Sequence, residues 1–150
     1  MRRFSIFICI QASLFASITE PISVALIRVS FKEDSTNSTT GNGQFLLTND
    51  GIDCGSYTID PPPHDYNYFL SQLHSVNQYF ENISYGKFSI DLEQSSIYPA
   101  SLNGDYQLSN TMDFYNPYGD PLVQEEKLTE LFKDAIEQSY SEDAIEFSQY

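Results

Sequence analysis

The sequence is short of the residue types that build metal sites and disulfide frameworks. Its 150 residues include two cysteines, two histidines and no tryptophan. Two cysteines are too few for a disulfide framework, and no cluster of cysteine and histidine has the spacing of metal ligands. The sequence therefore predicts neither a disulfide-stapled scaffold nor a metal site of its own.

Basic residues are also scarce. Seven lysines and arginines stand against 21 acidic residues, which gives a formal net charge of −14. Nucleic acids and anionic membrane surfaces repel such a chain, so we expect neither as a partner. Hydrophobic residues make up 41% and aromatic residues 15% of the chain, which is too much for a disordered protein. The length fits one domain or part of a larger one.

The first 17 residues have the pattern of a secretory signal peptide. A positive start, Met1-Arg2-Arg3, precedes an apolar run from Phe4 to Ala16 that ends in small residues. The alternative is a membrane anchor, but an anchor needs about 20 apolar residues and this run is shorter. We predict export to the periplasm or the medium, and a mature chain with a net charge of −16 and Cys54 as its one cysteine. We interpret that cysteine as a small apolar residue rather than a reactive thiol.

The first predicted strand is apolar on both faces. In Ile22–Phe31, the odd-numbered residues from Ala25 onward share one face, and Val24 and Leu26 share the other. A strand of this kind belongs in the middle of a covered sheet. A polar loop and a short second strand, Gln44–Thr48, are expected to follow.

A helix followed by a strand is predicted next. From Asp65 as N-cap, one apolar stripe recurs at helical spacing, consisting of Phe69, Leu73, Val76, Phe80 and Ile83. Gly86 supplies the helix end, and alternation in Lys87–Glu93 predicts a strand. We expect this strand to lie beside Val24–Phe31.

The C-terminal third is predicted to be an ordered loop and a second helix. Ile97–Tyr118 has no clear period and is rich in aromatic residues, which we expect to pack against another element. Asp120 as N-cap and Pro121 in the first turn begin the helix. Its apolar stripe comprises Leu128, Leu131, Phe132, Ala135 and Ile136. The chain ends at Tyr150 without a closing element, so we expect an incomplete α/β domain with a mixed twisted sheet.

The residues themselves offer no catalytic apparatus. His64 and His74 lie ten residues apart and lack a further ligand at a chelating interval, so we interpret both as structural. The pair His64-Asp65 is better explained by a helix cap than by an oriented base. No G-x-S-x-G elbow occurs, and the acidic run from Asp113 to Glu146 lacks the order of a calcium loop. We therefore assign no catalytic, cofactor-binding or metal-binding residue, and we interpret the acidic run as a solvated face.

The order of several short phrases resembles a known family. The phrases are Val24-Ala-Leu-Ile-Arg-Val-Ser-Phe31, Ile59-Asp-Pro-Pro-Pro-His-Asp65, Tyr79-Phe-Glu-Asn-Ile-Ser-Tyr-Gly-Lys-Phe-Ser-Ile90, Met112-Asp-Phe-Tyr-Asn116 and Ala144-Ile-Glu-Phe-Ser-Gln-Tyr150. Together they resemble the start of the catalytic domain of secreted M6-type metalloproteases, the immune-inhibitor-A-like zincins. The resemblance covers nearly all of residues 22–150, and its strongest part is the helix that ends in Ser-Tyr-Gly-Lys before a strand.

The resemblance implies an α+β zincin-like N-terminal subdomain that supplies strands and helices to a zinc endopeptidase. In that family the H-E-x-x-H helix comes after a further strand, so no ligand or catalytic glutamate maps onto this sequence. The resemblance implies protein or peptide substrates and zinc only for a full-length domain, and no activity for this chain alone. Two alternatives stay open: a non-catalytic exported binding module that uses its aromatic loop as contact surface, and a degenerate pseudo-peptidase. We therefore leave open whether the chain belongs to an enzyme.

Overall fold

The computed structural model describes residues 20–36, 41–48, 60–117 and 121–150. Their elements, in chain order, are β1 (Ala25–Ile27), β2 (Val29–Ser30), α1 (Tyr66–Ile83), β3 (Ser96–Tyr98), β4 (Tyr106–Gln107), α2 (Met112–Tyr115), α3 (Pro121–Asp143) and the 3-10 helix η1 (Phe147–Gln149). The predicted signal peptide, Cys54 and the Asp120 cap lie outside the described residues. Within them, no helix combines the length and the apolarity needed to cross a membrane.

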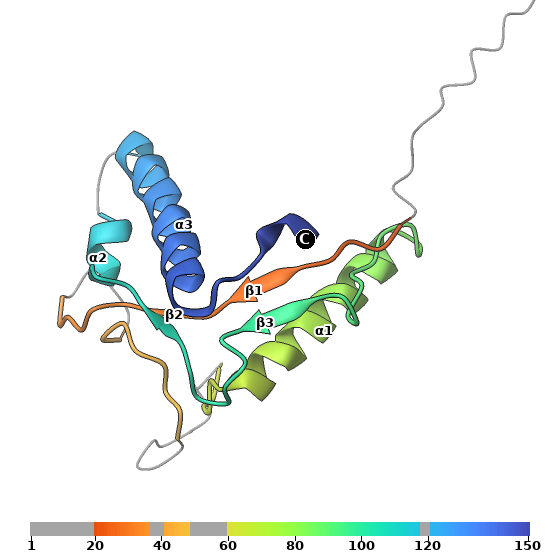
Figure 1. Cartoon of the computed structure of the whole chain (residues 1–150), viewed down its shortest axis with the longest axis horizontal. Coiled ribbons are helices and arrows are strands. Elements are labelled where there is room, and N and C mark those ends of the chain that lie inside the picture. Colours follow the sequence, from red (N-terminus) through yellow and green to blue (C-terminus); the bar gives the residue numbers. More distant parts are fainter. Residues whose placement is uncertain (1–19, 37–40, 49–59, 118–120) are drawn as a thin grey trace, which may run out of the picture.

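The segment from Ile22 to Lys32, which contains β1 and β2 and which we call the central strand, runs through the middle of the molecule (Figure 1). Along it, Ile22 bridges to Ile90, β1 pairs with β3, and β2 pairs with β4, each time in parallel. The even-numbered residues make these hydrogen bonds: for example, Arg28 N donates to Tyr98 O at 2.8 Å. Because neighbouring residues of a strand direct their peptide groups to opposite edges, β3 and β4 lie end to end along one edge.

The prediction of a strand over Lys87–Glu93 is wrong in its extent. Only Ile90 makes a bridge there, and a turn follows at once. The cause is Asp91, whose carboxylate accepts hydrogen bonds from the backbone N atoms of Glu93 and Gln94 at 3.1 and 3.0 Å. Such an Asx turn ends pairing and reverses the chain. The real partner of β1 is β3, which lies close behind this turn.

Two further expectations about strands are corrected. Gln44–Thr48 forms no strand in the described structure, although Gly43 O accepts a hydrogen bond of 2.9 Å from Phe31 N. Ile97–Tyr118, predicted as loop, contains most of β3 and all of β4 and α2. Strands of two or three residues are too short to show a period in sequence.

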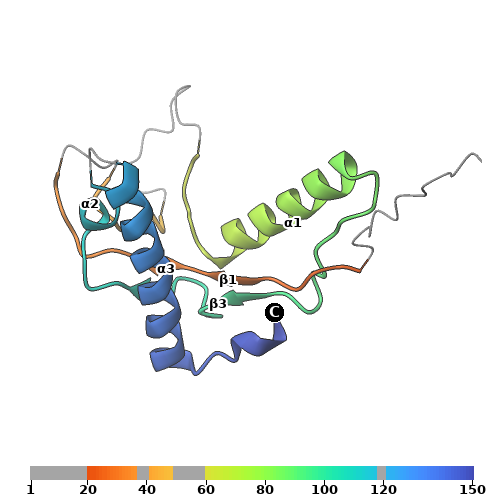
Figure 2. The same ribbon diagram turned by 90° about the horizontal axis from the view of Figure 1, so that it is seen from above.

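The helices cover opposite faces of the central strand (Figure 2). On the face of Val24 and Leu26, α1 packs through a buried core of Leu73, Ile90 and Ile97. On the opposite face, α3 lies over the odd-numbered residues of β1 and β2. Helices therefore lie on both faces of this strand, but the residues of β1 are half-buried and the strand pairs at one edge only, so the predicted place in the middle of a covered sheet is not what the described residues form. The fold is of the α/β class. The described strand pairs are all parallel, so the expected mixed sheet is not what these residues form.

Helix α1 begins and ends where the sequence predicts. The Asp65 carboxylate accepts from Tyr68 N at 3.0 Å as N-cap, and Gly86 follows the helix with φ +75°. Only the first half of the stripe is buried, however: Leu73 is 6% exposed, but Phe80 is 38% exposed. The buried core against α1 consists of Leu73, Ile90 and Ile97. Figure 2 shows the axis of α1 diverging from the strands toward its C-terminal end, which leaves that half of the stripe uncovered.

Helix α3 also lies in the predicted region, but only part of its apolar stripe is buried. Leu131 is half-buried and Ala135 is buried against the strand. Leu128, Phe132 and Ile136 remain exposed. The stripe is therefore buried only in part, and its exposed residues Phe132 and Ile136 border a groove.

Candidate functional site

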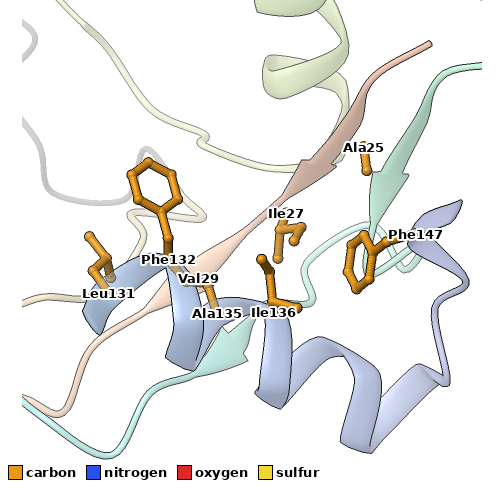
Figure 3. Close-up of a pocket in the computed structure, with 8 residues that line it drawn as sticks. All are labelled: Ala25, Ile27, Val29, Leu131, Phe132, Ala135, Ile136 and Phe147. Atoms are coloured by element: carbon orange, nitrogen blue, oxygen red, sulfur yellow. The ribbon is translucent and has the colours of Figure 1, made fainter. Parts of the chain in front are cut away.

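An apolar groove runs between the central strand and α3 (Figure 3). We call it the β1 groove. Its lining consists of Ala25, Ile27 and Val29 from the strand, Leu131, Phe132, Ala135 and Ile136 from α3, and Phe147 from η1. It has a volume of about 370 Å³, within the range of ligand sites. Since every lining side chain is apolar, the groove offers hydrophobic contact and no side-chain group for acid, base or nucleophilic chemistry.

The groove lies next to an open edge of the strand. The even-numbered residues of the central strand make the backbone hydrogen bonds to β3 and β4. The N–H and C=O groups of Ala25, Ile27 and Val29 therefore point to the other edge. No strand of the described ranges pairs there, and the edge is closed only at its end, where Phe31 N donates to Gly43 O. The site therefore combines free backbone donors and acceptors with an apolar surface beside them.

Buried tyrosine–carboxylate pairs fix the groove wall. Tyr106 in β4 is 1% exposed and donates to Oδ2 of Asp143 in α3 at 2.5 Å. Tyr115 in α2 donates to Oδ2 of Asp134 at 2.6 Å. Burial, and then the bond to its carboxylate, raises the pKa of both phenols, for Tyr115 to about 12. These bonds tie α3 to the elements on either side of it.

Three tyrosines of the segment 97–118 thus have a structural role. Tyr106 and Tyr115 are buried against α3, as expected of residues that pack on another element. Tyr98 Oη lies 2.9 Å from Tyr150 Oη, which holds η1 over the strands, and this bond raises the pKa of Tyr98. Tyr106 and Tyr115 are buried and therefore cannot belong to the aromatic contact surface of the binding-module alternative.

Arg28 is the buried charge of the central strand, at 1% exposure. Its guanidinium donates to the carbonyls of Leu102 and Ser101 at 3.1 and 2.5 Å, and also to that of Pro99. Burial lowers its pKa. The central strand changes its pairing partner at Arg28. The Arg28 N–H donates to Tyr98 O of β3, and the Arg28 C=O accepts a hydrogen bond from Tyr106 N of β4. No role was predicted for Arg28, although its charge within a predominantly apolar strand was an available signal.

The two histidines lie in different surroundings and do not form a site. Nε2 of His64 is 3.5 Å from Oδ2 of Asp60, without hydrogen-bond geometry, and its ring lies against Tyr68. His74 is exposed on α1. Asp65, the neighbour of His64, caps α1 as predicted. In the described part of the chain no three His, Cys, Asp or Glu side chains lie close enough to hold a metal ion.

The acidic residues gather on α3. Between positions 121 and 146 there are eight acidic residues and two lysines. Both lysines are paired within the helix: Lys127 with Glu130 at 2.7 Å and Lys133 with Glu137 at 3.7 Å. The net charge of α3, which forms one wall of the β1 groove, is therefore negative.

These observations describe a surface that can accept an extended backbone, and the described residues bring together no catalytic group. Comparison with known proteins adds no assignment: no protein-family model matches the sequence, and neither the curated proteins nor the solved structures contain a significant match.

Proposed function

We propose that the chain is the N-terminal scaffold of the catalytic domain of a secreted zinc endopeptidase of the M6 type. In this function it supplies parallel strands and two covering helices, and it is inactive alone. The resemblance of the phrases over residues 24–31, 59–65, 79–90, 112–116 and 144–150 supports the family. The proposal assigns protein or peptide substrates to the whole enzyme, outside the cell or in the periplasm.

One observation carries the proposal: β1 is covered by helices on both faces but is open at one edge. A parallel strand that is apolar on both faces is typical of the interior of a sheet, with neighbours on both sides. An incomplete sheet is the expected condition of a scaffold that functions together with another segment. The same edge would also serve a binding module, and the experiment below separates the two.

Zinc does not fit the described residues of this chain. A catalytic zinc site takes three protein ligands and keeps one open position. His64 with Asp60 provides two candidate groups at most, and His74 lies elsewhere. The zinc ligands of the proposed enzyme must therefore come from a segment other than these residues.

The test is made on the native protein. It would be captured from the medium or periplasm of its source with an antibody against the exposed face of α1, then analysed for mass, zinc content and casein cleavage. We expect a polypeptide longer than these residues, stoichiometric zinc and cleavage that a chelator abolishes. The recombinant 150-residue chain is the matched control and should cleave nothing. A native protein without zinc or cleavage would reject the endopeptidase and favour the binding module or pseudo-peptidase.

A further inference from the structure

Two asparagine–glycine pairs of the chain differ in how firmly the structure holds them. The pairs are Asn42-Gly43 and Asn103-Gly104, and both lie within the described residues. Asparagine is a thermolabile residue, and it is most prone to deamidation before glycine, which has no Cβ to keep its backbone nitrogen away from the side-chain amide. In a folded protein, the reaction therefore depends on how freely these two groups can approach each other.

The Asn42 amide is held on both sides. Its Nδ2 donates to Oε1 of Glu33 at 2.9 Å, and its Oδ1 accepts a hydrogen bond from Gln44 N at 3.2 Å. The main chain of the pair is fixed as well, because Gly43 O accepts from Phe31 N at 2.9 Å. The amide must leave both of its partners before Gly43 N can reach it.

The Asn103 amide is free. Asn103 is exposed in the turn from Ser101 to Gly104, and its side chain makes no hydrogen bond within the described ranges. The turn is closed by Gly104 N, which donates to Ser101 O at 3.4 Å, a long distance for a hydrogen bond. A Cβ at position 104 would collide with Ser101 Oγ and lie 2.9 Å from Pro99 Cγ, so the turn favours glycine there. The reactive pair is thus both accessible and part of the turn.

We propose that Asn103 is a site of spontaneous modification, at which the chain converts asparagine to isoaspartate and thereby loosens the anchor of Arg28. The backbone nitrogen of Gly104 attacks Cγ of Asn103. A new C–N bond forms, the bond from Cγ to Nδ2 breaks, and ammonia leaves with the proton of Gly104 N.

Water then opens the cyclic imide. Where water breaks the bond between the main-chain carbonyl carbon of Asn103 and Gly104 N, the chain continues through the side chain as isoaspartate. Where it breaks the newly formed bond, the product is aspartate. Water is the one co-reactant, so the modification is independent of the proposed endopeptidase.

The turn anchors two other parts of the fold. Leu102 O accepts hydrogen bonds from Tyr66 N, in the first turn of α1, at 2.8 Å and from Arg28 Nη1 at 3.1 Å. Ser101 O accepts from Arg28 Nη2 at 2.5 Å. Isoaspartate inserts one carbon into the main chain beside these carbonyls, so we expect them to shift away from the guanidinium. Because Arg28 is 1% exposed, the loss of these partners leaves a buried charge without compensation, which is destabilising.

The experiment compares the two pairs in one sample. The 150-residue chain is incubated at slightly alkaline pH and digested with trypsin, whose cleavage after Lys32, Lys87 and Lys127 places Asn42 and Asn103 in different peptides. Mass spectrometry follows the conversion of each pair, and a protein isoaspartate methyltransferase marks the isoaspartate product. We expect Asn103 to convert about tenfold faster than Asn42, since two exposed hydrogen bonds must open before Asn42 reacts. In urea this difference should vanish.

Two variants separate the new charge from the altered main chain. Asn103→Asp introduces the carboxylate without the extra backbone carbon, and Asn103→Gln, which forms no five-membered imide, should stay unmodified. The readout is hydrogen exchange of the Tyr66 amide, which has no partner within α1 and donates to Leu102 O. We expect this amide to exchange at least about tenfold faster in the isoaspartate form, and within about twofold of the parent rate in Asn103→Asp.

Four results would overturn the inference. The first is conversion of Asn42 at least as fast as that of Asn103 in the folded chain. The second is a rate difference that persists in urea, which would assign it to neighbouring residues and not to the fold. The third is unchanged exchange of the Tyr66 amide in the isoaspartate form, which would separate the modification from the anchor. The fourth is equally fast exchange in Asn103→Asp, which would make the charge the cause.

Discussion

Tyr106 Oη donates a hydrogen bond of 2.5 Å to Asp143 Oδ2, and this bond ties the last turn of α3 to β4. The phenol is almost completely buried. Hydrogen bonds to charged partners contribute about 1.5–3 kcal/mol. We expect Tyr106→Phe to lower the free energy of unfolding by that amount, measured by urea denaturation. Tyr140→Phe, at an exposed position of the same helix, is the control and should change it little. Equal effects of the two changes would contradict the role of the bond.

Alkaline pH should destabilise the fold through the same tyrosines. Tyr115 has a pKa of about 12 in the folded state and near 10 when unfolded, and the pKa of Tyr106 is raised as well. A raised pKa means that the folded state keeps its proton when the unfolded state has lost it. The stabilisation is therefore complete below pH 10 and falls as the pH rises from 10 toward 12. Urea midpoints over this range should fall less steeply in Tyr115→Phe than in the parent chain; an unchanged slope would refute the assignment.

The loss of unfolding free energy caused by core substitutions should differ along α1. Leu73 is buried with Ile90 and Ile97, so Leu73→Ala should cost about 2–5 kcal/mol in unfolding free energy. Phe80 lies against the ring of Phe88 but is over a third exposed, so Phe80→Ala should cost clearly less. Thermal denaturation of both variants provides the comparison. A larger loss for Phe80→Ala would mean that another segment covers the end of α1.

The isolated chain should bind no zinc tightly. Its described residues hold no cluster of three ligands, and His64 and His74 are separated. Metal analysis after dialysis should find less than stoichiometric zinc, and added zinc should produce no cleavage of casein. The double variant His64→Ala/His74→Ala serves as control. Stoichiometric zinc that this variant loses would reveal a site that involves these histidines.

Export should remove the N-terminal segment. If residues 1–17 are a signal peptide, the secreted protein begins near Ser17 to Glu20 and lacks both Arg2 and Arg3. Intact-mass spectrometry of secreted material tests this directly. Recovery of the chain with Met1 in a membrane fraction would instead support the anchor.

The long-range features of this fold were less predictable than the local ones. The Asp65 cap, the bounds of α1, the start of α3 and the apolarity of both faces of the central strand follow from patterns within a few residues. Pairing with Ser96–Tyr98 was missed, because three residues show no period and Asp91 ends the more regular pattern before them. The β1 groove was missed for a related reason: Phe132 and Ile136 have the spacing of core residues, and only the arrangement of the strands leaves them exposed.

The position of Arg28 has a consequence for the order of folding. It reaches the Pro99 carbonyl 71 residues further along the chain, and β1 and β3 pair across a similar separation. Contacts of such high sequence separation form slowly, because a long loop must close before they contribute. During synthesis the central strand therefore stays unpaired until the residues after position 95 have left the ribosome. If residues 1–17 act as the predicted signal peptide, they can be recognised before the sheet closes, because the pairing partner of the central strand has not yet been synthesised.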